Sequence, residues 1–264
     1  LRKSDVTSAV LGSEKRLRRF IGNNERWGGQ KMSKTVRKLK DQMNMLQRWE
    51  VMRRFGRRFT LAADSFRPVF ENIYLGKKGL AVATTTHTLL AIKDCHRMSE
   101  GFYSPKLFDQ VEVEKPFPDW EKVVPDSDFV ALLTADEVAK FAKTLRVMDK
   151  MRTGWGANEF FSPLYYVSIS YEKGAAKESS NYLCLKYGKY ENNVLEVLLE
   201  SKILIHFEVE PQGYDALMNP TYLKTVFEAI EMTKQPAVLV LTHSLNTLML
   251  RTEKVICLAT PARK

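Results

Sequence analysis

Cys95 and His96 are the most reactive side chains that stand next to each other in this sequence. A thiol beside an imidazole is the pair from which a cysteine nucleophile is activated. Adjacent residues of a strand point to opposite faces, however, so we expect these two not to act together. The remaining histidines, His87, His206 and His243, lack metal-ligand spacing, and no phosphate-binding glycine loop occurs in the sequence. The sequence therefore predicts no catalytic residues, no metal, no cofactor and no enzymatic activity.

Lysine and arginine offer a different chemistry, the binding of phosphate. The 264-residue chain has a formal net charge of +10. Residues 1–58 hold 17 Lys and Arg against 5 Asp and Glu, whereas the remainder holds 24 against 26. A basic segment joined to a near-neutral body indicates a polyanionic partner, nucleic acid first. The alternative is a solvated basic arm without a partner.

Two amphipathic helices are predicted to present part of this charge. Apolar residues recur every three or four positions from Ser33 to Phe55, and Gly56 is expected to end that helix. A second apolar stripe follows Thr134, which we interpret as an N-cap. The alternative is that these charged residues only form the solvent-exposed faces of the two helices and bind no partner. The candidate DNA-binding residues are Arg37, Lys38, Lys40, Arg48, Arg53, Arg54, Lys140, Lys143, Arg146 and Lys150.

Carboxylates on the predicted helices have simpler explanations than catalysis. Asp136 and Glu137 stand in a first turn, where they favour the helix dipole. Glu228 and Glu231 belong to a third helix, predicted over 222–232, and are expected to be solvated on its exposed face. None of these pairs is expected to act as an acid and base.

Short β-rich runs surround these helices. They cover 59–92, with a turn at Gly76–Gly79, and then 165–171, 182–187, 194–199, 203–209, 237–241 and 247–251. The order of helix and then strands recurs at a spacing of about 100 residues, which favours an α+β fold built of related units.

No apolar run approaches the ~20 residues that span a bilayer, and no signal-peptide core is seen. We expect a cytoplasmic protein without membrane contact. Cys95, Cys184 and Cys257 are odd in number and far apart, so buried free thiols are predicted.

Three regions of the sequence, within residues 66–87, 117–125 and 219–263, resemble motifs of the bacterial DNA polymerase sliding clamps, the beta subunit of DNA polymerase III. The run Asn219–Leu223 resembles the NPxYL start of the last clamp helix, and the chain ends in a Pro-x-Arg tail at Pro261–Arg263. Phe117–Pro125 resembles the FPDYxxVxP junction that leads into the last clamp domain. Phe66–Leu75 and Gly79–His87 are similar to the family's RPxLxxV and GxLxxxATDGHRL strands.

The resemblance covers roughly residues 35–264 and implies an architecture. It implies DNA-clamp-like units, each with helices packed on antiparallel sheets, plus a basic helical N-terminal segment. The domains expected are a basic arm over 1–32, a shortened clamp-like domain over 33–116 and a C-terminal clamp-like domain over 117–264. Lining helices of such a fold contact phosphates through many weak charges, because tight contacts would impede sliding.

A partner pocket is the second surface that the resemblance implies. It would take a short peptide from a replicative polymerase or clamp loader, with apolar anchors supplying most of the affinity. Thr85-Thr86-His87-Thr88 stands where the family has Asp-Gly-His-Arg, and strand ends without a partner are the alternative. The residues carried over are Thr84, His87, Leu89, Pro118, Val123, Thr260, Pro261, Ala262 and Arg263.

The function predicted is that of a DNA sliding clamp or clamp-like processivity factor, which encircles double-stranded DNA and tethers a replication partner. Its subunits are expected to associate head to tail into a homo-oligomeric ring. The alternative is a nucleic-acid-binding or assembly protein that keeps a clamp-derived fold without the ring and holds nucleic acid with its basic N-terminal arm.

Overall fold

The computed structural model describes residues 25–27, 30–32, 43–62, 65, 67–124, 129–154, 164–173, 181–192, 194–205, 207, 211, 213–242 and 247–262. The helical elements are α2 (Met45–Phe55), η1 (Gly56–Phe59), α3 (Pro68–Glu71), η2 (Lys77–Gly79), η3 (Trp120–Val123), α4 (Ala135–Gly154) and α5 (Pro220–Thr233). The strands are β1 (Glu25–Trp27), β2 (Gln30–Met32), β3 (Ile73–Gly76), β4 (Leu80–Thr84), β5 (Thr88–Ile92), β6 (Gly101–Tyr103), β7 (Gln110–Val111), β8 (Phe129–Leu133), β9 (Leu164–Lys173), β10 (Asn181–Glu191), β11 (Val194–Leu204), β12 (Asp215–Met218), β13 (Ala237–Leu241), β14 (Leu248–Arg251) and β15 (Val255–Ala259).

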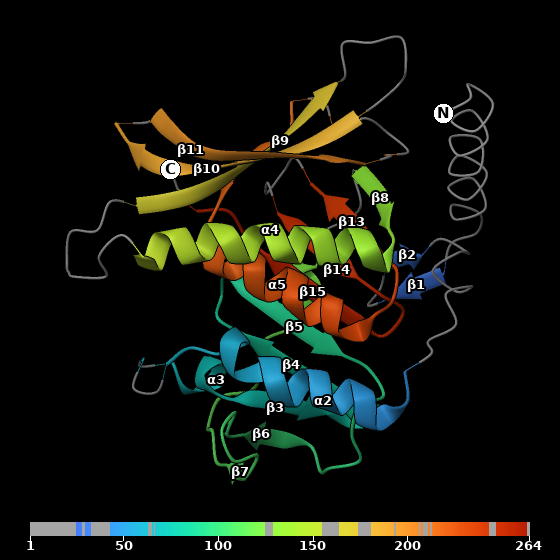
Figure 1. Cartoon of the computed structure of the whole chain (residues 1–264). Helices are drawn as coiled ribbons and strands as arrows, with labels where there is room; N and C mark the ends of the chain where they lie inside the picture. The colour runs from blue at the N-terminus through green and yellow to red at the C-terminus, as the bar shows by residue number, and fades with distance from the viewer. Residues whose placement is uncertain are drawn as a thin grey trace.

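The described strands form three antiparallel sheets, a two-stranded one of β1 and β2 and two larger ones that organise the chain (Figure 1). Of these two, the larger has nine strands in the order β7-β6-β3-β4-β5-β15-β14-β13-β8, and the smaller has four in the order β11-β10-β9-β12. The second part of the chain repeats one unit of strand, helix and three strands. One copy of this unit begins with β8 and the other begins with β12. The first strand of each copy pairs with a strand of the other copy, because β8 pairs with β13 and β12 pairs with β9. These features confirm the predicted α+β fold with helices packed on antiparallel sheets.

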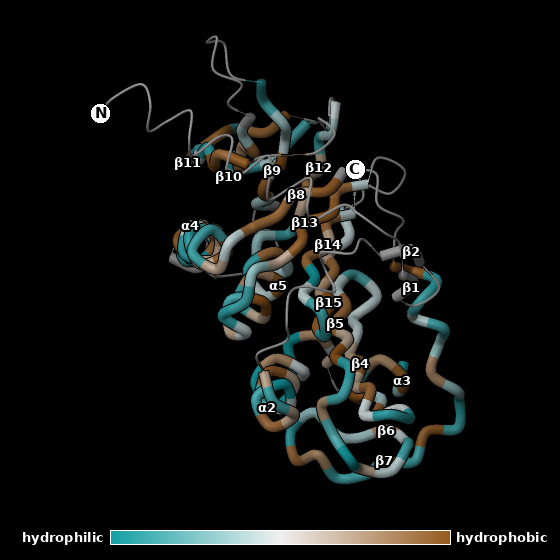
Figure 2. The backbone as a smooth tube through the Cα atoms, turned by 90° about the vertical axis from the view of Figure 1, so that its right-hand side faces the viewer, coloured by the Kyte–Doolittle hydropathy of each residue, from teal (hydrophilic) through white to brown (hydrophobic). Residues whose placement is uncertain are grey.

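The central strands of the nine-stranded sheet are buried on both faces. Alternate residues of β5 divide between two apolar clusters: Leu90 and Ile92 face the helices, whereas Leu89 and Ala91 face Trp120. Because both faces are covered, the central strands are continuous apolar runs without a polar face. Figure 2 shows α4, α5 and α2 in a row along one face of the sheet.

Helices α4 and α5 begin as the sequence predicts. Thr134 Oγ1 accepts a hydrogen bond from the Glu137 amide at 3.2 Å, and Glu137 Oε2 accepts one from the Thr134 amide at 2.7 Å. This reciprocal capping box satisfies two donors that a helix start leaves unpaired. Asn219 caps α5 through the Thr221 amide at 2.9 Å, with Pro220 in the first turn.

The first predicted helix is shorter than expected. Asn44 has an extended backbone and forms a capping box with Gln47, so the described helix begins at Met45 and does not run unbroken from Ser33. The helix ends at Phe55 with Gly56 as its C-cap, as predicted, although Gly56 keeps a right-handed backbone and begins η1. A Cβ there would lie 2.7 Å from Ile73 Cδ1, so the glycine allows close packing on β3.

Other local predictions were wrong in detail. The predicted strands over 194–199 and 203–209 are one strand up to Leu204. The Arg67-Pro68 segment, interpreted as a strand, contains the short helix α3, with Pro68 in its first turn. The Gly76–Gly79 turn is present, with Gly79 at a φ of 71°. The domain boundary between residues 116 and 117 stays a prediction.

The three cysteines are free and buried, as predicted. Burial raises the pKa of Cys95 to about 12, and it also raises the pKa of Cys257. Among the described residues, no helix is long and apolar enough to cross a membrane.

Candidate nucleic-acid interface and partner-binding region

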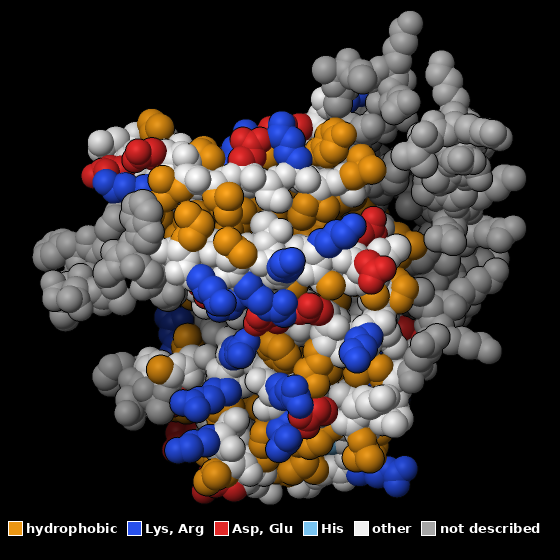
Figure 3. Space-filling model, in the orientation of Figure 1, with side chains coloured by type: hydrophobic (Ala, Val, Ile, Leu, Met, Phe, Trp, Pro, Cys, Tyr) orange, Lys and Arg blue, Asp and Glu red, His pale blue; other side chains and the backbone are white. Residues whose placement is uncertain are grey.

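Lys and Arg side chains gather on the face formed by α4, α5 and α2 (Figure 3). We call this surface the helix face, defined by α2, η1, α4 and α5. The two central helices are held together by apolar contacts, of which the stacking of Phe141 on Phe227 is the clearest, with ring centroids 4.9 Å apart. Both rings are buried, so the cationic surface rests on a packed core.

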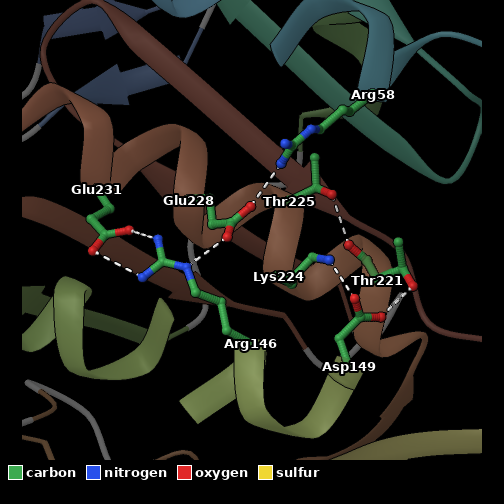
Figure 4. A network of polar contacts seen from close by, with 8 residues as sticks. All are labelled: Arg58, Arg146, Asp149, Thr221, Lys224, Thr225, Glu228 and Glu231. Atoms are coloured by element: carbon green, nitrogen blue, oxygen red, sulfur yellow. Dashed lines mark hydrogen bonds and ion pairs between the residues drawn. The ribbon is translucent and has the colours of Figure 1, made fainter. Parts of the chain in front are cut away.

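Arg146 is the centre of an ion-pair network between α4 and α5 (Figure 4). Its Nε donates to Glu228 Oε1 at 2.7 Å, and its guanidinium also pairs with Glu231. These hydrogen bonds, to Glu231 first and Glu228 second, raise the pKa of Arg146. Arg58 of η1 donates to the other oxygen of Glu228 at 2.8 Å. The expectation that Glu228 and Glu231 are merely solvated was wrong, because they connect three helical elements.

A second ion pair joins the same helices one turn away. Asp149 of α4 pairs with Lys224 and accepts a hydrogen bond from Thr221 Oγ1 at 2.8 Å. Together with the Arg146 contacts, it fixes how the two helices lie on one another. Arg146 is therefore a residue that positions the helix face, and its charge is largely neutralised by its partners.

The arginines of α2 are also engaged. Glu50 accepts from Arg53 Nε at 2.7 Å and from Arg54 Nε at 2.6 Å, and these hydrogen bonds lower the pKa of Glu50 to about 2. Arg48 donates to the Asp94 carbonyl at 3.0 Å and to the Met43 carbonyl at 2.5 Å. Arg48 therefore ties α2 to the end of β5, whereas Arg53 and Arg54 remain at the surface.

Lys140 and Lys143 are the cations of α4 that stay most available. Both are exposed, and within the described residues neither takes part in an ion pair. Lys150 is exposed at the far end of the same helix. Arg37, Lys38 and Lys40 lie outside the described residues. Of the predicted set, Lys140 and Lys143 are therefore the best placed to meet a phosphate.

The structure brings together only part of the predicted partner pocket. The Thr260 amide donates to the His87 carbonyl at 2.8 Å, and the Ala262 amide donates to the Leu217 carbonyl at 2.8 Å. Pro261 lies between these two anchored positions, while His87 stacks on Tyr222 with ring centroids 5.9 Å apart. The described tail therefore runs beside the β4–β5 turn and near the start of α5.

The remaining predicted pocket residues lie elsewhere or are not described. Leu89 is buried on the other face of the sheet, in the apolar cluster of Trp120. Pro118 lines a separate cavity of about 560 Å³ together with Val69 and Pro116. Val123 is exposed in η3. Arg263 lies outside the described residues. The pocket as a set of residues stays a prediction.

In the turn at Thr85–Thr88, Thr85 and Thr86 stand where the sliding-clamp motif has an aspartate and a glycine. Thr85 Oγ1 accepts from the Thr88 amide at 3.0 Å and the His87 amide at 3.3 Å, which is the role that an aspartate carboxylate fills in such turns. Thr86 has a φ of 78°, in the left-handed region that favours glycine.

We expect Thr86→Gly to raise the free energy of unfolding by about 0.5–1 kcal/mol. A left-handed backbone costs a residue with a Cβ about 1–2 kcal/mol, and glycine avoids this strain. Glycine also loses more conformational entropy on folding, which reduces the gain by about 0.5–1 kcal/mol. Urea denaturation of the purified protein measures the change. Thr86→Ala is the matched control, because it keeps a Cβ and should gain less. Equal stability of all three proteins would show that the turn is not strained.

Two groups of reactive side chains lie outside these regions. His96 Nε2 lies 2.7 Å from the Leu80 carbonyl, and Cys95 Sγ lies 3.7 Å from the Ile92 carbonyl, so each is held by backbone. They follow β5 in a turn and are not strand residues, contrary to the expectation. Glu172, Cys184 and Glu200 form a described cluster that could hold a metal ion. Lys186 and Lys202 already pair with Glu172, at 3.2 Å and 2.7 Å.

No sequence family matches this chain, and no curated protein matches it. Solved structures do. A DNA polymerase sliding clamp from Bacillus subtilis superposes with a TM-score of 0.56 at 14% identity, covering 82% of this chain and 62% of that one. The fold is that of a bacterial DNA polymerase sliding clamp. The beta sliding clamp of Caulobacter crescentus and the DNA polymerase III subunit beta of Pseudomonas aeruginosa each give a TM-score of 0.57 at 14% identity.

The chain covers 64% of the Caulobacter clamp and 65% of the Pseudomonas protein, slightly less than two thirds of their length. The sliding-clamp fold explains the order found here. Helix-first units of three strands, α2–β3–β4–β5, α4–β9–β10–β11 and α5–β13–β14–β15, lie side by side and place their helices on one face. At this level of identity the likeness establishes the fold, and the sliding-clamp motifs in the sequence are in agreement with it.

Proposed function

We propose that this chain is a clamp-like, non-enzymatic DNA-binding protein that holds double-stranded DNA against its helix face and acts as a processivity factor in replication. The observation that carries the proposal is the helix face itself: α2, α4 and α5 lie in a row on one side of the sheet and carry more Lys and Arg than Asp and Glu. Such a surface suits phosphates at many positions and reads no base sequence.

The local electrostatics support weak and mobile contact. Arg146, Arg58, Arg53 and Arg54 already have carboxylate partners, so they contribute a screened field and no tight phosphate clamp. Lys140 and Lys143 add exposed charge on long flexible side chains. Diffuse contacts of this kind hold a duplex without fixing its register, as sliding along DNA requires.

We also propose that this protein tethers a replication partner. The proposed location for this function is the cytoplasm. The tethering draws support from the anchored tail at Thr260 and Ala262, which runs beside His87 and Tyr222 in the order that the clamp motifs imply. A short peptide from a polymerase or clamp loader is the partner proposed there. Closure of a ring around DNA remains part of the sequence-based prediction.

Deletion of residues 1–32 separates this function from its alternative, in which the basic N-terminal arm holds nucleic acid. We expect the shortened protein to bind two duplexes of unrelated sequence with affinities within about threefold of the full chain, because the helix face is intact. Fluorescence anisotropy at low salt measures both affinities. A decrease of tenfold or more on both duplexes would assign the nucleic-acid contact to the arm and would overturn the proposal.

A further inference from the structure

A hollow of about 530 Å³ lies on the helix face, between the end of α2, η1, α4 and α5. Its apolar lining consists of Phe55 and Met232, and the rest of its lining is charged. The charged residues are Arg54, Arg58, Arg146, Lys234, Glu228 and Glu231. Four cations against two carboxylates leave an excess of positive charge, so the hollow attracts anions although it contains carboxylates.

Glu228 is the carboxylate that links two of these cations (Figure 4). Its two oxygens have separate partners: Oε1 accepts from Arg146 Nε at 2.7 Å, and Oε2 accepts from Arg58 Nη1 at 2.8 Å. The Glu228 side chain is only 13% exposed, so water and salt screen its ion pairs little. In the free protein Glu228 therefore occupies the position that a phosphate oxygen would take on either arginine.

Arg58 is the partner that can leave Glu228. Its side chain is 52% exposed, and among the described residues Glu228 is the one carboxylate that pairs with it. Arg146 is less exposed and is also held by Glu231, so the loss of one carboxylate does not release it. The Arg58 guanidinium lies 5.0 Å from the centroid of the Phe55 ring. This cation–π contact keeps Arg58 beside the hollow when its carboxylate is exchanged.

The hollow holds more cations than the packing of α4 on α5 requires. Arg146 with Glu231 already joins these helices, and so does the ion pair of Asp149. Lys234, in the left-handed cap of α5, is exposed, and no described carboxylate pairs with it. Because Arg58 and Lys234 both line the hollow, one phosphate there could accept hydrogen bonds from two cations.

We propose that a backbone phosphate of the bound duplex enters this hollow and replaces Glu228 on Arg58. Glu228 is then an internal counterion: it neutralises Arg58 while the protein is free, and it stays paired with Arg146 after the exchange. This exchange rests on the proposed DNA binding and adds a residue that regulates it. Each phosphate contact replaces an ion pair that already exists, so the net gain is small and the contact breaks readily, as movement along a duplex requires.

Glu228→Gln tests the exchange directly. The amide keeps the size of the side chain but removes the charge that holds Arg58, so duplex affinity at low salt should rise about threefold to tenfold. Glu231→Gln is the matched control, because it changes the charge equally in the same hollow but leaves Arg58 paired with Glu228. Its affinity should rise less than about twofold. Fluorescence anisotropy with two duplexes of unrelated sequence measures the affinities, and circular dichroism shows whether each variant is folded.

A double-mutant cycle shows whether the gain comes from Arg58. Arg58→Gln should weaken duplex binding about threefold in the wild-type protein and about tenfold or more beside Glu228→Gln, because the released arginine then carries more of the affinity. Equal effects of Arg58→Gln in the two backgrounds, or equal gains from Glu228→Gln and Glu231→Gln, would overturn the exchange and leave the proposed function in place. Should Glu228→Gln fail to fold, Arg58→Gln alone decides, since unchanged affinity would overturn the exchange. A wild-type protein that binds no duplex would overturn both.

Discussion

Replacing Phe141 by alanine is expected to cost about 3–5 kcal/mol of unfolding free energy, the range found when a buried aromatic side chain is truncated to alanine. Phe141 is fully buried on α4 and stacks on Phe227 of α5, so its removal leaves a cavity between the two helices. Domains of this size are stable by about 5–15 kcal/mol, so the decrease is a large share of the total.

Urea denaturation followed by circular dichroism measures the Phe141→Ala effect through the shift in midpoint. Phe141→Leu is the matched control, because it keeps most of the apolar volume and should cost clearly less. The Arg146 network stays in place in both variants. A decrease below about 1 kcal/mol for Phe141→Ala, far under the usual range, would mean that α4 is not packed on α5 as described, and the helix face would lack its foundation.

The second large effect is on DNA affinity. Reversing Lys140 and Lys143 to glutamate should weaken binding to duplex DNA by about tenfold or more at low salt, because two cations that attract phosphate become two anions that repel it. Arg146 is left unchanged, since its reversal would set three carboxylates together and disturb α4 and α5. The weakening should be equal on duplexes of unrelated sequence, since no base-reading side chain is involved.

The control for this variant is a pair of lysines of the same exposure on another surface. Lys106 and Lys115 are exposed in the loops around β7, at the opposite end of the molecule from α4. Reversing them changes the net charge equally, so a general charge effect would appear in both variants. An equal decrease of affinity in the two would remove the helix face from the proposal.

Local chemistry explains which parts of the fold could be predicted from the sequence. Thr134 and Glu137 cap α4, and Asn219 with Pro220 starts α5, because caps depend on neighbouring residues alone. The first helix was predicted too long because an apolar period continues upstream of Asn44, whereas the capping box at Asn44 fixes the observed start. Where the capping residues and the apolar periodicity disagree, as they do here, the helix begins at the capping residue.

Tertiary contacts explain what could not be predicted. Glu228 and Glu231 have the pattern of a solvated helix face, and only the approach of α4 and η1 gives them Arg146 and Arg58 as partners. β11 was predicted as two strands because the polar residues Ser201 and Lys202 interrupt its apolar run, yet an edge strand tolerates such residues. Leu89 was grouped with His87, but it faces the opposite side of the sheet from the helices and the tail.

The salt dependence of DNA binding tests the central claim most directly, namely that α4 presents its lysines to the phosphates of duplex DNA. The logarithm of affinity should fall linearly with the logarithm of salt concentration for the wild-type chain, with a slope of about 0.9 per phosphate neutralised. For Lys140→Glu/Lys143→Glu the slope should be shallower by about two units, one for each phosphate that these lysines no longer neutralise. Parallel lines for the two proteins would contradict the account, because they would place the phosphate-binding residues on another surface.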